Sequence, residues 1–237
     1  KRQWPAVSRT LSRAAAHAAE AARLLDTLAD SDMQPVQGPT QDTLSVSGLL
    51  KLDEARQRNV LRRWFKRLNL SVPTTIHLQH IQHDILNAAA DSIPCVGWGS
   101  VNQGAEARRY RDLIYAMPRL PAHNPHITRT WDMRQPLTLA GVGTFTATST
   151  SGAGIKASLL TEQSVSVRFR QCGERCRPAG RGHTHELRKL FQERGVPPWR
   201  RDRLPLIYIG DKLAAVANLW VCEPFNATHN EPGVAVK

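Results

Sequence analysis

The segment Ser164-Val-Ser-Val-Arg-Phe-Arg170 decides the fold of the last third of this chain. Its apolar residues Val165, Val167 and Phe169 alternate with polar or cationic residues, and successive side chains of an extended strand point to opposite faces. The segment therefore predicts a half-buried strand whose open face carries the two arginines.

The residues around this strand predict a mixed α/β unit. Apolar residues after Thr184 recur at helical spacing, Thr184 is a suitable N-cap, and Gly195 ends the predicted helix. A hairpin with a tight Gly-Asp turn is predicted for residues 206–217. Upstream, the residues predict another hairpin over 137–146 and then a flexible loop over 148–158.

The first half of the chain has mainly helical periodicity and ends in β-rich residues. We predict an alanine-rich helix reaching Ala29, a loop over 31–47, a helix from an Asp53 N-cap to Leu68, a third helix from Pro73 to Ala89, and a hairpin of strands 95–98 and 109–115. We therefore expect an α+β protein with two domains. A mainly helical domain over 1–118 ends in a β-hairpin, and a mixed α/β domain follows over 119–237.

The helix predicted over 53–68 carries an apolar stripe on one face and six cations on the others. Within the helix only Glu54 opposes these cations, so they repel one another along i,i+4 rows. Two interpretations stay open, a solvated face and a face that binds phosphate. The six cations are Arg56, Arg58, Arg62, Arg63, Lys66 and Arg67.

Composition restricts the class of protein. The 237 residues carry 32 Lys and Arg against 20 Asp and Glu, a formal net charge of +12, which favours a polyanionic partner. The 41% of hydrophobic residues exclude a disordered tail. No apolar run reaches the ~20 residues of a membrane span. Four scattered cysteines form no disulfide framework, so we expect a cytoplasmic protein. Because the chain begins with Lys1, we expect it to be part of a longer protein.

Catalytic motifs are missing from the sequence, which has no Gly-x-Ser-x-Gly elbow, no His-Glu-x-x-His and no Gly-x4-Gly-Lys-Ser/Thr loop. Cys172, Cys176, His183 and His185 include the donor types of a zinc site, but their spacing is unusual. Two free cysteines in a basic loop are the preferred interpretation. Three histidines at three-residue steps drift around a helix and predict polar surface: His77, His80 and His83.

The strongest signal is a concentration of arginine. Eleven cations, ten of them Arg, lie between residues 168 and 203, against four carboxylates. Guanidinium groups bind phosphate oxygens in a bidentate manner, and the glycines of loop 172–182 allow close backbone approach. We expect this loop to lead into a helix N-terminus that favours anions. A second cluster of arginines surrounds Tyr110, whose ring is able to stack on a base. The pattern favours RNA or DNA as the partner.

Several segments resemble one known family. They are Ser164–Arg170, the Gly-Glu-Arg-Cys-Arg-Pro run ending at Pro178, Gly180-Arg-Gly182, Leu187–Glu193, Gly195-Val-Pro-Pro-Trp-Arg-Arg-Asp-Arg203, Leu204–Gly210 and Leu213–Ala217. In this order they resemble the C-terminal domain of the bacterial tRNA(Ile)-lysidine synthases. Leu61–Phe65 and Arg108–Arg111 resemble the helical substrate-recognition domain of that family, and Trp4-Pro5 resembles the segment that joins it to the catalytic domain.

The resemblance implies an ATP-dependent ligase that joins lysine to the wobble cytidine of a tRNA(Ile) with a CAU anticodon. The family's catalytic signature, Ser-Gly-Gly-x-Asp-Ser, is absent from this sequence. The resemblance thus places ATP and magnesium in an N-terminal domain that the chain lacks. It implies that the chain alone is inactive and has no catalytic residue, metal or cofactor of its own. It also implies that the partner of the chain is tRNA and that no membrane is involved.

The resemblance also implies which cations contact tRNA. Carried over by position, the candidates are Arg62, Arg63, Arg109, Arg111, Arg170, Arg175, Arg177, Arg181, Arg188, Lys189 and Arg203. Two alternatives remain open. One is a non-catalytic interaction module that packs against a catalytic domain or subunit, with RNA contact incidental. The other is an unrelated DNA-binding protein. The sequence leaves the oligomeric state undetermined.

Overall fold

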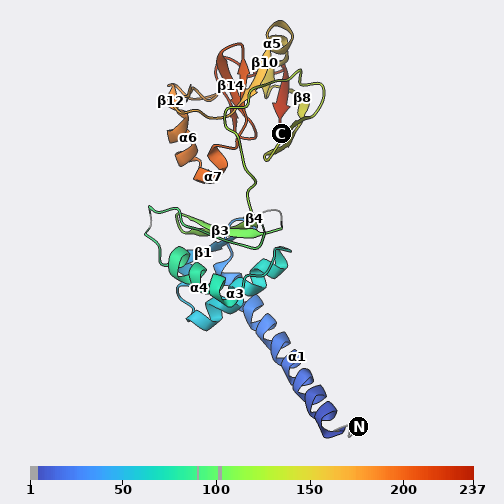
Figure 1. Ribbon diagram of the computed structural model, residues 1–237. Helices are drawn as coiled ribbons and strands as arrows, with labels where there is room; N and C mark the ends of the chain where they lie inside the picture. The colour runs from blue at the N-terminus through green and yellow to red at the C-terminus, as the bar shows by residue number, and fades with distance from the viewer. Residues whose placement is uncertain (1–4, 90, 101–102) are drawn as a thin grey trace. The chain divides into compact units, whose positions relative to one another are not determined.

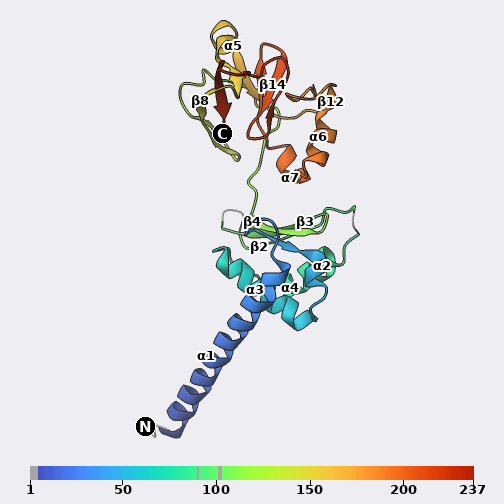
Figure 2. The same ribbon diagram turned by 180° about the vertical axis from the view of Figure 1, so that it is seen from behind.

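A computed structural model describes residues 5–89, 91–100 and 103–237. Trp4, part of the joining segment expected above, lies outside the described residues. The chain divides into two compact units, unit 1 up to Pro121 and unit 2 from Ala122 onward (Figures 1 and 2). Each unit has its own hydrophobic core. No helix among the described residues is long and apolar enough to cross a membrane.

Unit 1 consists of helices packed against one antiparallel sheet. Its strands are ordered β1-β4-β3-β2, and α3 and α4 lie along one side of this sheet (Figure 1). In chain order its elements are α1 (Pro5–Met33), the 3-10 helix η1 (Gln34–Val36), β1 (Thr43–Ser45), α2 (Val46–Leu49), α3 (Glu54–Arg67), α4 (Thr75–His80), the π-helix η2 (Ile81–Leu86), β2 (Cys95–Trp98), β3 (Ala105–Tyr110) and β4 (Leu113–Pro118).

Helix α3 forms where its cap and apolar stripe predict. The Asp53 carboxylate accepts a hydrogen bond from the backbone N–H of Arg56 at 2.9 Å, which satisfies one of the free N–H groups of the first turn. The stripe that includes Trp64 and Phe65 is fully buried against the sheet and α4. This burial is the main stabilisation of unit 1.

Three predictions for unit 1 are wrong. The expected strand over 109–115 is interrupted by a turn at Arg111 and Asp112, where Arg111 has φ 57°, so β3 and β4 are the hairpin strands. The turn is fixed because the Asp112 carboxylate accepts hydrogen bonds from the Ser47 N–H and hydroxyl. The expected loop over 31–47 contains β1, which pairs with β4. Ala89 lies beyond the helix, which ends at Leu86.

Unit 2 contains four small sheets and three short helices among its described residues. The strand orders are β15-β14-β13-β10-β5, β8-β16-β9, β11-β12 and β6-β7. In chain order the elements are β5 (Arg129–Thr130), β6 (Leu137–Leu139), β7 (Gly143–Phe145), β8 (Ala147–Ser151), β9 (Ile155–Lys156), α5 (Ala157–Glu162), β10 (Val165–Arg168), β11 (Arg175–Cys176), β12 (His185–Glu186), α6 (Leu187–Glu193), α7 (Pro198–Arg201), β13 (Leu206–Ile209), β14 (Lys212–Val216), β15 (Trp220–Val221) and β16 (Pro232–Val236).

Both faces of the five-stranded sheet of unit 2 contribute residues to a hydrophobic core. Val165, Val167 and Phe169 enter the core on one face, as their alternation predicts. The other face packs against α6 through Leu190 and Phe191. The predicted hairpins over 206–217 and 137–146 are both present as antiparallel pairs, β13 with β14 and β6 with β7.

Two predictions for unit 2 are wrong. The expected flexible loop over 148–158 contains β8 and β9, both paired with β16 near the end of the chain. Thr184 does not cap a helix, because the next residues form β12 and α6 begins only after Glu186. Strand pairing overrides the local preference in both cases, with the distant β16 for β8 and β9 and with the nearby β11 for β12.

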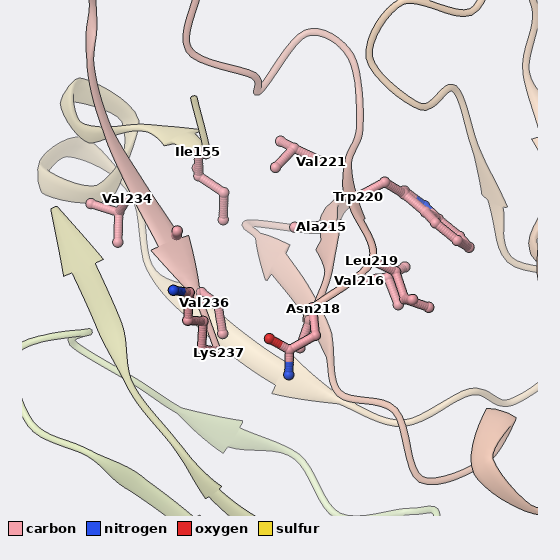
Figure 3. A pocket seen from close by; sticks show the side chains of 13 residues that line it. Ile155, Ala215, Val216, Asn218, Leu219, Trp220, Val221, Val234, Val236 and Lys237 are labelled. Carbon is pink, nitrogen blue, oxygen red and sulfur yellow. The ribbon is translucent and has the colours of Figure 1, made fainter. Parts of the chain in front are cut away.

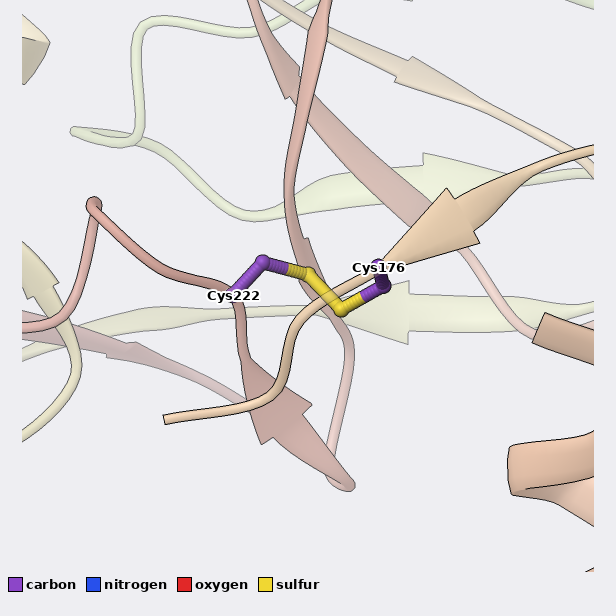
Figure 4. Close-up of a disulfide and its surroundings, with 2 residues drawn as sticks. All are labelled: Cys176 and Cys222. Carbon is purple, nitrogen blue, oxygen red and sulfur yellow. A yellow bond between two sulfur atoms is a disulfide. The ribbon is translucent and has the colours of Figure 1, made fainter. Parts of the chain in front are cut away.

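A disulfide bond joins β11 to the residue after β15. Cys176 and Cys222, 46 residues apart, are both buried and bonded to each other (Figure 4). The expectation that Cys176 is a free thiol in a basic loop is therefore wrong, and its sulfur is not available as a zinc ligand. Cys172 is free and exposed. No group of three or more His, Cys, Asp or Glu side chains among the described residues is arranged to hold a metal ion.

Candidate nucleic-acid interface

The cations of α3 face acidic residues of α1. Arg63 donates hydrogen bonds to Asp30 at 2.7 Å and to Asp26 at 2.9 Å, and Arg56 donates to the buried Asp32. Lys66 and Arg67 lie near the same α1 carboxylates. These α1 carboxylates relieve the repulsion among cations that Glu54 alone opposes within α3. The four-residue step between Asp26 and Asp30 places both on one helix face, a sequence signal that can identify this contact.

The ion pairs divide the two α3 candidates into different environments. The hydrogen bond from Arg63 is the main reason that the pKa of Asp30 lies below its ordinary value. Arg62, the residue before Arg63, is exposed and makes no ion pair with any described residue. Of the two, Arg62 has the free guanidinium that a phosphate contact needs.

The candidates of the β3–β4 hairpin have local partners. Arg109 donates to the carbonyl oxygens of Ile85, Leu86 and Ala88 at 2.9–3.1 Å, so it binds the carbonyl groups at the C-terminal end of η2. The Arg111 guanidinium lies 5.2 Å from the centroid of the Tyr110 ring. Arg109 is therefore held by the helix end, and Arg111 is the exposed cation of this hairpin.

In unit 2, five exposed candidate cations come from β11, the loop after it and α6, and we call this group the α6 basic surface. Arg175 on β11 is in register with Glu186 on β12, whose chain continues directly into α6. Figure 1 shows β12 and α6 side by side. The five residues are Arg175, Arg177, Arg181, Arg188 and Lys189.

The α6 basic surface rests on a rigid base. Leu187 and Phe191 of α6 are buried beside the Cys176–Cys222 disulfide, which fixes β11 beneath the cations. The backbone N–H of Leu187 donates to the carbonyl oxygen of Glu174 at 2.9 Å. The anion site expected at the N-terminus of α6 stays a prediction, and the first N–H of this seven-residue helix is already bonded. The side chains carry the positive charge.

Three candidates of unit 2, two of them outside this surface, have partners within the fold. Arg170 is largely buried and lies 3.2 Å from the Asp202 carboxylate. Arg203 donates to the carbonyl oxygen of Gly141 at 2.7 Å. Arg181 belongs to the α6 basic surface but also forms an ion pair with Glu193 at 2.7 Å. The other four cations of that surface form no ion pair with a described residue.

Sequence reasoning missed two residues beside this surface. Arg194 follows α6 directly and is exposed, and Trp220 begins β15 and packs on Phe191 with ring centroids 5.6 Å apart. Arg194 was visible as one of the eleven cations between residues 168 and 203. Trp220 gave no signal, because a single Trp near a predicted hairpin is typical of a core residue.

Comparison with known proteins matches a family model to part of each unit. Residues 44–115 match the family model described as the TilS substrate binding domain, and residues 165–237 match the model described as the TilS substrate C-terminal domain. A solved structure entitled "Crystal structure of TILS C-terminal domain" overlaps 46% of this chain and 93% of its own, at 17% identity and a TM-score of 0.36, which is too weak to bear on the fold.

Relatives across nearly the whole chain carry one name. A tRNA(Ile)-lysidine synthase of Coxiella burnetii is 45% identical over 98% of this chain and 51% of its own length, and one of Methylococcus capsulatus is 36% identical over 99% of this chain and 53% of its own. This chain belongs to the tRNA(Ile)-lysidine synthase family, which confirms the resemblance. It spans about half the length of the curated relatives it matches.

Proposed function

We propose that this chain is the tRNA-binding part of a tRNA(Ile)-lysidine synthase and that the α6 basic surface holds the tRNA through its phosphates. The observation that carries the proposal is that Arg175, Arg177, Arg188 and Lys189 are exposed on one folded base without a carboxylate partner among the described residues. Cations that form no ion pair and stand on a rigid base bind phosphates without first breaking internal contacts.

Unit 1 contributes a smaller set of contacts in this proposal. Arg62 and Arg111 are exposed and carry the interaction there. Arg63 and Arg109 support it by holding α1 and η2 in place. In unit 2, Arg170 and Arg203 have the same supporting role. The candidates thus separate into cations that contact phosphate and cations that position the elements carrying them.

The ligation reaction belongs to the remainder of the protein. By analogy with the named relatives, the whole protein joins lysine to the wobble cytidine of a CAU-anticodon tRNA(Ile) with ATP and magnesium. No group of three or more His, Cys, Asp or Glu side chains among the described residues could hold a metal ion. We assign no chemical step to this chain, and its role is to hold the substrate.

A competition experiment with a charge-matched control tests this function. The chain binds labelled tRNA(Ile) transcript in the presence of unlabelled tRNA or duplex DNA, and we expect tRNA to compete at least tenfold better. The variant Arg175→Ala/Arg188→Ala/Lys189→Ala should lose most of its affinity. The variant Arg129→Ala/Arg134→Ala/Lys212→Ala removes the same charge from exposed positions of unit 2 outside the surface and should retain it.

Two results would contradict the proposal. Equal competition by duplex DNA would indicate a general polyanion binder. Equal loss in the two triple variants would mean that net charge, not the α6 basic surface, determines binding. A chain that binds no tRNA but associates with the remaining half of a tRNA(Ile)-lysidine synthase would support the interaction-module alternative, which the substrate-binding family models do not favour.

A further inference from the structure

A hollow of about 290 Å³ opens beside the α6 basic surface. Its apolar wall is formed by Pro178, Leu190, Leu219 and Trp220, and its charged rim by residues at the end of α6 together with Arg181. Ligand pockets begin at about 300 Å³ and combine apolar walls with a few polar groups. This hollow therefore has the size and lining for one small, flat ligand that carries a charge.

A second hollow of about 300 Å³ lies on the other side of the β14–β15 turn and serves as a comparison. Leu219 and Trp220 line both hollows. In Figure 3 the second hollow is surrounded by aliphatic side chains such as Ile155 and Val234, and the Trp220 ring points away from them. Lys237 is the only cation that lines it. The aromatic ring and the arginines thus serve the first hollow.

The Trp220 ring is positioned by packing. It contacts Phe191 at a 45° interplanar angle, and its Nε1–H is buried without an acceptor among the described residues. A buried donor without an acceptor is unfavourable, so the ring gains stability from a ligand that supplies one. Indole rings at nucleic-acid interfaces commonly stack on unpaired bases.

The rim of the hollow carries net positive charge. Arg181 is paired with Glu193, whereas Arg194 is exposed and has no ion-pair partner in the part of the chain that is described. Arg181 also belongs to the α6 basic surface. A nucleic-acid backbone bound on that surface therefore runs directly past the hollow, where Arg194 supplies the next phosphate contact.

We infer that this hollow receives one unpaired nucleotide of the bound RNA. The base lies against Leu219 and Trp220, and its phosphate is bound by Arg194. A base within a duplex is not available to such a pocket, because its faces are already stacked. The inference rests on the proposed tRNA-binding function and adds to it a site that distinguishes single-stranded from paired RNA.

The test compares two RNA probes with the full chain. A single-stranded RNA tetranucleotide is titrated to millimolar concentration, and a blunt-ended RNA duplex is titrated in parallel, with isothermal titration calorimetry as the readout. We expect Arg194→Ala and Trp220→Phe each to weaken tetranucleotide binding at least fivefold and duplex binding less than twofold. Lys212→Ala removes an exposed cation of unit 2 outside the hollow and should leave both unchanged.

The outcomes separate this inference from the proposed function. The nucleotide site is overturned if the tetranucleotide does not bind, or if Arg194→Ala weakens binding of both probes equally. Either result overturns it even when intact tRNA still binds through the α6 basic surface. Failure of the wild-type chain to bind tRNA overturns the proposed function itself. Trp220→Phe and Arg194→Ala must keep the melting temperature of the wild type. A loss of binding then results from the altered site and not from unfolding.

Discussion

The Arg63 guanidinium and the Asp30 carboxylate are joined at 2.7 Å, and this contact connects α3 to the C-terminal end of α1. Asp26 accepts a further hydrogen bond from the same guanidinium. Much of α1 is exposed, for example Leu11 and Leu24 at 64% and 66%, so the helix contributes little apolar burial along those turns. Its C-terminal end is held to the rest of unit 1 by these ion pairs and by the buried Ala29 and Met33.

Neighbouring arginines of α3 should separate stability from binding. Arg63→Ala leaves Asp26 and Asp30 without their main partner, and we expect a loss of about 1 kcal/mol in the free energy of unfolding, because the pair is only partly buried. Arg62→Ala should leave stability unchanged and weaken tRNA binding. Thermal unfolding and filter binding of both variants measure this. The assignment of Arg63 to stability and Arg62 to binding is wrong if Arg62→Ala lowers stability and Arg63→Ala weakens only tRNA binding.

The same ion pair predicts a dependence of stability on pH. The pKa of Asp30 is lower in the folded protein, chiefly because of the Arg63 hydrogen bond, so the charged carboxylate stabilises the fold above about pH 4. This contribution is lost as the pH falls through the lowered pKa. Unfolding of the wild type followed between pH 6 and pH 3 should therefore show a steeper decline than that of Arg63→Ala. Parallel curves would exclude the pair as a source of stability.

Removing Arg109 should destabilise unit 1 more than removing an exposed arginine. Its guanidinium binds three carbonyl groups at the end of η2, and hydrogen bonds to a charged group contribute about 1.5–3 kcal/mol. Arg119→Ala, at an exposed position just after β4, is the matched control. We expect a clear drop in melting temperature only for Arg109→Ala. A large loss of tRNA affinity at unchanged melting temperature would instead return Arg109 to the phosphate-binding set.

The disulfide should stabilise the base of the α6 basic surface. Cys176→Ser opens a link across 46 residues, and disulfides that close such loops contribute about 2–4 kcal/mol. Cys172→Ser, at a free cysteine of the same loop, is the control. Unfolding without reductant should show a lower melting temperature only for Cys176→Ser, and added dithiothreitol should reduce the wild type to the same value. No effect of reductant would contradict a structural role of the bond.

Local patterns were sufficient to predict much of the fold. The alternation at Val165 and Val167 and the Asp53 cap each concern residues that are close in sequence, and both predictions are confirmed. Two of the errors arise where distant segments meet. The β8–β16 pairing and the Cys176–Cys222 bond join residues far apart in sequence, and periodicity carries no information about such contacts.

In the candidate site too, features set by residues close in sequence could be predicted, and features set by distant contacts could not. Arginine enrichment around α6 indicated the α6 basic surface, because its cations are neighbours in sequence. Whether an arginine is free depends on partners elsewhere, such as Asp30 for Arg63 or Gly141 for Arg203. Charge counting along the sequence therefore cannot separate phosphate-binding cations from positioning ones, and the three-dimensional contacts are needed.

The salt dependence of tRNA affinity tests the central claim most directly. Each phosphate neutralised by a cation releases counterions, so log affinity should fall with log salt by about 0.7–0.9 per contact. With four or more unpaired cations on the α6 basic surface, we predict a slope of about −3 or steeper. Arg175→Ala/Arg188→Ala/Lys189→Ala should reduce its magnitude by about 2–3. Affinity independent of salt, or an unchanged slope in this variant, would contradict the account.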